Sequence, residues 1–145
     1  MKNCFVVVCS VAVLFSASGV MAAGSGVLSE ITTCYQKAGE NTEQINHCLN
    51  EEYEAVVAEY KDVTERVAVI AKSWDKPNRN RVRWDKLMKA NQAFKGYVGR
   101  ECDFVENTTR GARILEKNAE MACKINLYRM RVDFLENRYL SAEKE

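Results

Sequence analysis

The sequence has little proline and little histidine. Its 145 residues include one proline, Pro77, and one histidine, His47. Because proline interrupts helices, its scarcity permits long uninterrupted helical segments. A single histidine and the lack of any Cys-x-x-Cys pair argue against a zinc site. No nucleophile motif or phosphate-binding loop occurs either, so we expect no metal, no cofactor and no enzymatic activity.

An excess of one charge is also missing. The chain carries 21 basic and 20 acidic residues, for a formal net charge of +1. A nucleic-acid-binding domain usually shows a clear basic excess, so we do not expect nucleic acid as a partner. No alternating strand pattern, internal repeat or low-complexity tract is present. The composition therefore favours a helical protein whose partners depend on how its charges are distributed.

The first 22 residues resemble an export signal. Lys2 supplies the positive start, residues 6–15 form an apolar core, and Val20, Met21 and Ala22 form a small-residue cleavage site. We expect a periplasmic or secreted protein in which residues 23–145 form a single domain, without stable membrane insertion after cleavage. The alternative is an uncleaved anchor, because the apolar run of residues 4–21 is nearly long enough to span a membrane.

Helical periodicity dominates the rest of the chain. Apolar residues recur at spacings of three and four through residues 49–74, which predicts a helix over residues 42–74, about 50 Å long. Thr42 is its expected cap. The apolar positions are Leu49, Tyr53, Val56, Tyr60, Val63, Val67, Ile70 and Trp74.

Further helices must cover this apolar face. A short helix is expected over residues 29–38 with Ser29 as its cap, and a third should start at Asn78 or Asn80. Two later faces repeat the same spacing: Trp84, Leu87, Asn91, Phe94 and Val98, and then Asn118, Met121, Ile125, Tyr128, Val132, Leu135 and Tyr139. Short connections favour antiparallel neighbours. The prediction is an all-α, antiparallel bundle of three long helices plus a short N-terminal helix.

Four cysteines remain after the signal: Cys34, Cys48, Cys102 and Cys123. An even number in an exported protein indicates two disulfides. The midpoint of the first two lies in the predicted turn at residues 39–41, and the midpoint of the last two lies beside Gly111. Residues equally far from a turn face each other on antiparallel helices. We therefore predict the pairs Cys34–Cys48 and Cys102–Cys123, each joining one helical hairpin.

Two segments concentrate charge. Residues 40–65 hold eight acidic residues against one lysine, and residues 72–89, bounded by Lys72 and Lys89, hold seven basic residues against two aspartates. Compensation of the helix dipole accounts for part of this pattern. The functional alternative is an acidic face for a basic partner and a basic tip for an anionic one. The candidate residues are Glu51, Glu52, Glu54, Glu59 and Asp62 for the face, and Arg79, Arg81, Arg83 and Trp84 for the tip.

The segment of residues 87–102, LMKANQAFKGYVGREC, resembles the signature of the LprI-like lysozyme inhibitor family. Members carry a helix that reads roughly L-x-x-A-Q-R-A-W-x-x-[YF]-R-D-x-x-C. Cys34 and Cys48 resemble the family's first cysteine pair, and Cys123, Arg131 and Leu135 resemble its closing helix. Phe94 stands in place of the signature tryptophan, and Val98 and Gly99 stand in place of the Arg-Asp pair. The resemblance covers residues 30–139.

The resemblance implies a helical, disulfide-bonded, exported protein that inhibits lysozyme. Lysozymes are commonly basic, so the acidic residues would provide charge complementarity to a lysozyme or another basic protein. The alternative hypothesis is a non-enzymatic module of the cell envelope. It would bind an anionic envelope component, such as lipid headgroups or a wall polymer, through residues 72–89.

Overall fold

The computed structural model describes residues 25–75 and 81–141, and helices form nearly all of them. These are α1 (Ser25–Ala38), α2 (Thr42–Asp75), α3 (Val82–Thr108), α4 (Arg113–Leu135) and a final π-helical turn, η2 (Glu136–Leu140). The predicted all-α class is confirmed. The predicted signal segment, residues 1–22, lies outside the described residues. Within residues 25–75 and 81–141, no helix is both long enough and apolar enough to cross a membrane.

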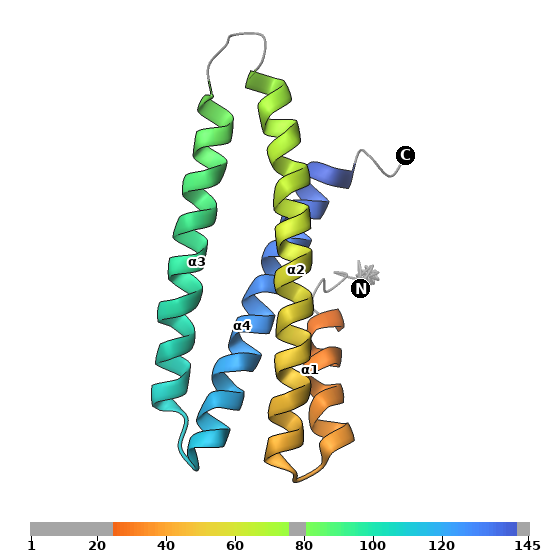
Figure 1. The fold of residues 1–145 in the computed structure, drawn as a ribbon, viewed down its shortest axis with the longest axis vertical. Helices are drawn as coiled ribbons and strands as arrows, with labels where there is room; N and C mark the ends of the chain where they lie inside the picture. Colours follow the sequence, from red (N-terminus) through yellow and green to blue (C-terminus); the bar gives the residue numbers. More distant parts are fainter. Residues whose placement is uncertain (1–24, 76–80, 142–145) are drawn as a thin grey trace, which may run out of the picture.

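Helix α2 is the element on which the others pack (Figure 1). Successive helices run in opposite directions, with α1 beside the first half of α2 and α3 beside α2 on its other side. Helix α4 crosses behind α2 and contacts α1, α2 and α3. The antiparallel bundle of three long helices and one short helix is therefore as predicted. Because α4 touches every other helix, it closes the core.

The core contains two apolar clusters along α2. The larger one joins α2, α3, α4 and η2, and it includes Val56, Tyr60, Val63, Val67, Val98, Cys102, Tyr128, Val132, Leu135 and Leu140. The smaller one, nearer the start of α2, joins Cys34, Ile45, Leu49 and Ile125. Trp74 was expected at the end of the apolar face, but it is 50% exposed. The next residue, Asp75, is buried there instead because it binds the start of α3.

The expected helix caps were wrong. Ser29 lies inside α1, which begins at Ser25, and Thr42 is the first helical residue of α2 rather than its cap. The cap of α2 is Asn41, whose Oδ1 accepts a hydrogen bond from the Gln44 backbone N–H at 3.1 Å. Helix α3 begins at Val82, and its first turn donates backbone hydrogen bonds to the Asp75 carboxylate. Asn78 and Asn80 lie outside the described residues.

A buried asparagine interrupts the apolar face of α4. Asn118 is 1% exposed, and its Oδ1 accepts a hydrogen bond from Asn46 Nδ2 at 2.8 Å. Its own Nδ2 donates to the Thr42 carbonyl oxygen at 3.2 Å. Since a buried polar group must be hydrogen-bonded, these two contacts explain how the asparagine fits a core position. They also tie the start of α4 to the first turn of α2.

Both predicted disulfides are present. Cys34–Cys48 joins α1 to α2, and Cys102–Cys123 joins α3 to α4, with a Cα–Cα distance of 5.6 Å in each. That distance is typical of unstrained disulfides. Each bond closes one helical hairpin, as the spacing about the turns predicted. The bundle is thus covalently fixed at the end of the molecule where α2 starts and α3 ends (Figure 1).

Candidate functional site

The acidic residues of α2 divide between two faces of the helix. Glu51, Glu54 and Asp62 are exposed and fall on one side, because their spacing brings them within about 80° of one another around the axis. Glu65 lies on the same side and is exposed. We name Glu51, Glu54, Asp62 and Glu65 the acidic stripe. It forms a row of negative charge on the outer surface of α2.

Among the described residues, the ion pairs of Glu51 and Asp62 are local ones within α2. The Glu51 carboxylate lies 3.6 Å from His47 Nδ1, and the Asp62 carboxylate lies 3.9 Å from Arg66 Nη1. The side chains of Glu51 and Asp62 are 71% and 70% exposed. Exposed pairs at this separation contribute at most about 1 kcal/mol, so both carboxylates can exchange these contacts for a partner.

Glu52 and Glu59 do not belong to the acidic stripe. Both are half-buried, and they lie on the same side of α2 as each other. The Glu59 carboxylate pairs with Arg129 of α4, and Arg129 also binds Glu30 of α1 at 3.1 Å. Burial disfavours the charged guanidinium, but the two carboxylates outweigh it and raise the pKa of Arg129. Glu59 therefore belongs to an ion-pair network, centred on Arg129, that joins three helices, a role that the charge pattern alone did not suggest.

The basic tip is organised around Trp84. The Arg81 guanidinium carbon lies 4.1 Å from the centre of the indole ring, and Lys72 Nζ lies 5.8 Å from it. Both distances are typical of cation–π contacts. Arg83 is different, because its Nη1 donates to the Trp74 carbonyl oxygen at 2.8 Å. The predicted residue Arg79 lies outside the described residues.

Asp75 fixes this tip from the last turn of α2. Its carboxylate accepts hydrogen bonds from the backbone N–H groups of Arg83 and Trp84 at 3.0–3.1 Å. Burial would raise the pKa of the Asp75 carboxyl, but these bonds and the Arg83 charge outweigh it and lower that pKa. The carboxylate thus caps α3 with both of its oxygens. It sets the geometry of the hairpin between α2 and α3.

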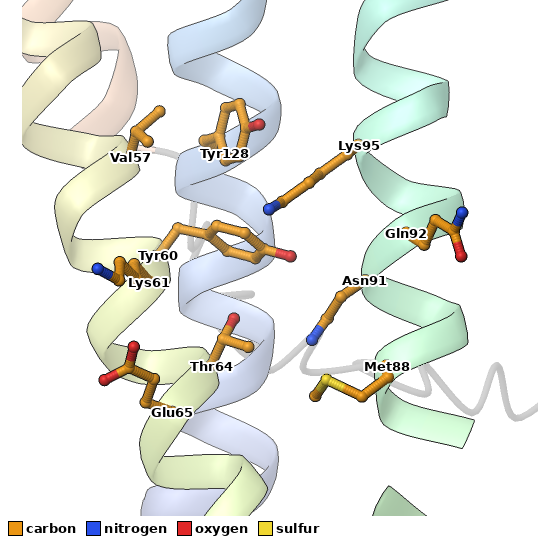
Figure 2. Close-up of a pocket in the computed structure, with 10 residues that line it drawn as sticks. All are labelled: Val57, Tyr60, Lys61, Thr64, Glu65, Met88, Asn91, Gln92, Lys95 and Tyr128. Carbon is orange, nitrogen blue, oxygen red and sulfur yellow. The ribbon is translucent and has the colours of Figure 1, made fainter. Parts of the chain in front are cut away.

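A groove of about 530 Å³ lies between α2 and α3, bordered also by Tyr128 of α4 (Figure 2). Three polar atoms in its wall are buried and have no hydrogen-bond partner among the described residues: Tyr60 Oη, Thr64 Oγ1 and Asn91 Nδ2. An unpaired buried polar group costs about 1–3 kcal/mol. Three of them in one wall are therefore unusual for a site with only a packing role.

Aromatic rings support the groove. Tyr60, Phe94 and Tyr128 contact one another with ring centres 5.2–5.6 Å apart. Burial raises the pKa of the Tyr60 phenol, while the nearby Thr64 hydroxyl and the Arg131 charge offset part of that rise. Burial also raises the pKa of Tyr128. Tyr60 therefore carries a neutral hydroxyl at physiological pH.

A comparison with protein families finds a match over most of the chain. The family described as "Lysozyme inhibitor LprI" matches residues 34–135. The chain belongs to the LprI family. No curated protein and no solved structure matches the chain. The matched region begins at Cys34, contains all four disulfide cysteines and ends at Leu135, the last residue of α4. The LprI family is one of inhibitors rather than enzymes.

Two residues that differ from the LprI signature, Phe94 and Val98, pack in the larger apolar cluster with Tyr60 and Tyr128. Phe94, in place of tryptophan, packs on Tyr60 and lies 5.7 Å from the Arg131 guanidinium carbon. Val98, in place of the signature arginine, is 3% exposed and belongs to the larger apolar cluster. An arginine at that position would need a partner in the core. The apolar replacement therefore fits the packing seen here.

One acidic cluster has oxygen atoms close enough to hold a cation. Among the described residues, Asp103, Glu106 and Glu120 bring oxygen atoms within 4.8 Å of one another. Glu120 also forms an ion pair with Lys124 in the next turn of α4. Partly exposed carboxylates of this kind are common without a metal ion, and nothing else at the cluster points to a ligand.

Proposed function

We propose that this protein is an exported inhibitor that binds a lysozyme through the acidic stripe of α2. The observation that carries the proposal is membership of the LprI family over residues 34–135. The two disulfides support it, because such bonds are typical of proteins outside the cytoplasm. In this proposal the protein acts by binding, and its own residues perform no chemistry.

The acidic stripe has the properties that such binding requires. Its carboxylates are exposed, they point away from the core, and they lie on a helix held by a disulfide at one end and by Asp75 at the other. A partner with a basic surface is drawn to such a stripe by long-range attraction, which raises the association rate. A rigid helix loses little conformational entropy on binding.

The first experiment measures lysozyme activity in the presence of the purified, oxidised protein. Several lysozyme types are titrated, and residual lysis of a cell-wall suspension is followed over time. We expect loss of activity at micromolar inhibitor for at least one type. If every type retains full activity at micromolar excess, the inhibitor proposal is wrong.

A second experiment tests the surface. The variant Glu51→Lys/Glu54→Lys reverses two charges of the acidic stripe, and Asp85→Lys/Asp103→Lys reverses two exposed charges on α3. We expect the first variant to weaken inhibition at least tenfold, a loss of about 1.4 kcal/mol, and the control to stay near the original value. Equal weakening by both variants would point to net charge rather than to the stripe.

A second candidate function is favoured by the exposed stack at the basic tip. Arg81 and Lys72 lie against Trp84 and leave two cations beside an aromatic ring, which suits an anionic envelope surface. Binding to vesicles that contain an anionic lipid should then fall as salt rises. The variant Arg81→Ala should reduce it, while Lys117→Ala, a matched exposed change on α4, should not.

We also propose that the protein is periplasmic or secreted after removal of residues 1–22. The mass of the protein recovered from the periplasm or the medium tests this directly. We expect a chain that begins at Ala23 and contains no free thiol. A full-length chain recovered in the membrane fraction would instead indicate the retained anchor.

A further inference from the structure

We propose that the groove between α2 and α3 binds a small organic monocarboxylate. The proposal rests on Tyr60 and Asn91, which are 3% and 7% exposed. Their side-chain polar atoms, Oη and Nδ2, lack hydrogen-bond partners among the described residues and point into the space between the two helices (Figure 2). The inference goes beyond lysozyme inhibition, because the groove and the acidic stripe share only Glu65, at the outer edge of the groove.

The three buried polar groups in the groove wall can all donate hydrogen bonds. The Asn91 carbonyl Oδ1 accepts a bond from Arg131 Nη2 at 3.4 Å, which leaves Nδ2 turned toward α2. The hydroxyls of Tyr60 and Thr64 lie across from it and close to each other, and each can donate one proton or accept one. A ligand that accepts several hydrogen bonds at one end, as a carboxylate does, satisfies all three groups.

The charges nearby favour an anion with a single charge. Lys95 extends from α3 toward the Tyr60 ring, with Nζ 6.0 Å from the ring centre. Arg131 adds positive potential at the Tyr60 hydroxyl from the side of α4. Glu65 lies at the outer edge, beside Lys61, and would repel a second negative charge. A monocarboxylate fits this field better than a dianionic phosphate ester does.

The walls favour an organic ligand over an inorganic ion. Val57, Met88 and the Tyr128 ring provide apolar surface around the donors, and the groove has a volume of about 530 Å³. An inorganic monoanion would leave most of that space and surface uncovered. A carboxylate attached to an aromatic or aliphatic body would cover it, with the body against the rings and the charge at Lys95.

The test uses benzoate and its neutral isostere benzamide on the oxidised mature protein. Binding is followed by the ¹H–¹⁵N signals of the side-chain amides, which include Asn91 in the groove and Asn107 outside it as an internal reference. We expect benzoate to shift the Asn91 amide in a saturable manner, and benzamide to bind at least tenfold more weakly. An Asn91 signal that does not move at saturating benzoate, or equal binding of the two probes, would overturn the proposal.

Matched variants distinguish benzoate binding in the groove from general attraction of benzoate to surface lysines. Lys95→Met and Lys89→Met each remove one exposed cation from α3, but only Lys95 lines the groove. We expect Lys95→Met to weaken benzoate binding about tenfold and Lys89→Met to leave it unchanged. Equal effects of the two substitutions would show that benzoate binds the basic surface and not the groove.

A third variant tests the buried donor. Asn91→Asp keeps the size of the side chain and the contact with Arg131 but replaces the amide donor with an acceptor. Circular dichroism tests whether the variant is folded. If Asn91→Asp unfolds, Thr64→Val removes a different hydrogen-bond donor from the groove. We expect benzoate binding to be lost in Asn91→Asp and weakened several-fold in Thr64→Val. Binding that survives both substitutions would refute the assigned donors.

Discussion

Arg129 offers the sharpest test of how the helices are held together. Its guanidinium binds Glu59 of α2 and Glu30 of α1 from α4, and its side chain is 17% exposed. A buried hydrogen bond to a charged group contributes about 1.5–3 kcal/mol, whereas an exposed ion pair contributes at most about 1 kcal/mol. The two carboxylates are 33% and 42% exposed, so the pairs fall between these limits.

We therefore expect Arg129→Met to lower the free energy of unfolding by about 2 kcal/mol, since methionine retains the packing of the aliphatic stem. Tm should fall by roughly 6–10 °C for a domain of this size. Urea unfolding followed by circular dichroism measures the loss. Lys117→Met, which removes an exposed cation from the same helix, is the control and should stay within about 0.5 kcal/mol of the parent protein.

A double-mutant cycle with Glu59→Gln tests whether the pair itself is responsible. In the Glu59→Gln background, Arg129→Met should cost less than it does in the parent protein, because one of its two partners is already neutral. The cost should also shrink in high salt, since Glu59 is partly exposed. If Arg129→Met matches Lys117→Met, the three-helix ion pair contributes nothing to stability and our account of it is wrong.

Three further changes test other parts of the fold. Gly39→Ala should destabilise the fold by about 1 kcal/mol, because Gly39 has φ 58°, where a side chain is strained. Gly99→Ala lies inside α3, where an added Cβ is equally free of contacts, and should stabilise the fold by about 0.5–1 kcal/mol. Urea unfolding measures both changes. Asp75 has a lowered pKa in the fold, so its contribution is present above pH ~4 and is lost on further acidification. Asp75→Asn should therefore show a smaller acid-induced drop in Tm than the parent protein, and an equal drop would contradict the cap. Cys102→Ala/Cys123→Ala should lower the free energy of unfolding by about 3 kcal/mol but keep the helical circular dichroism signal at low temperature. A loss of that signal would show that the apolar clusters cannot hold the helices together without the disulfide.

The apolar spacing along the chain was sufficient to predict the helices and their order. A face such as that of α2 must be covered, and one proline at residue 77 and breaks near residues 40 and 110 leave few ways to fold the chain back. The cysteines then follow, because positions equally distant from a turn become neighbours only in an antiparallel hairpin. Both disulfides are local consequences of this rule.

The roles of individual polar residues were decided by tertiary structure. Asp75 and Arg83 are nearby in sequence, but only the hairpin places one to cap the helix of the other. Glu59 is indistinguishable from Glu51 and Glu54 in a charge count, and only the position of Arg129 on α4 turns it into an internal partner. Tyr60 and Asn91, which border the groove, both occur at apolar-repeat positions. The repeat alone therefore predicts that they are core residues. Periodicity shows which side of a helix is covered by other helices. A hydrogen bond depends instead on which residue of another helix lies opposite, and these pairs of residues are set only when α3 and α4 pack on α2.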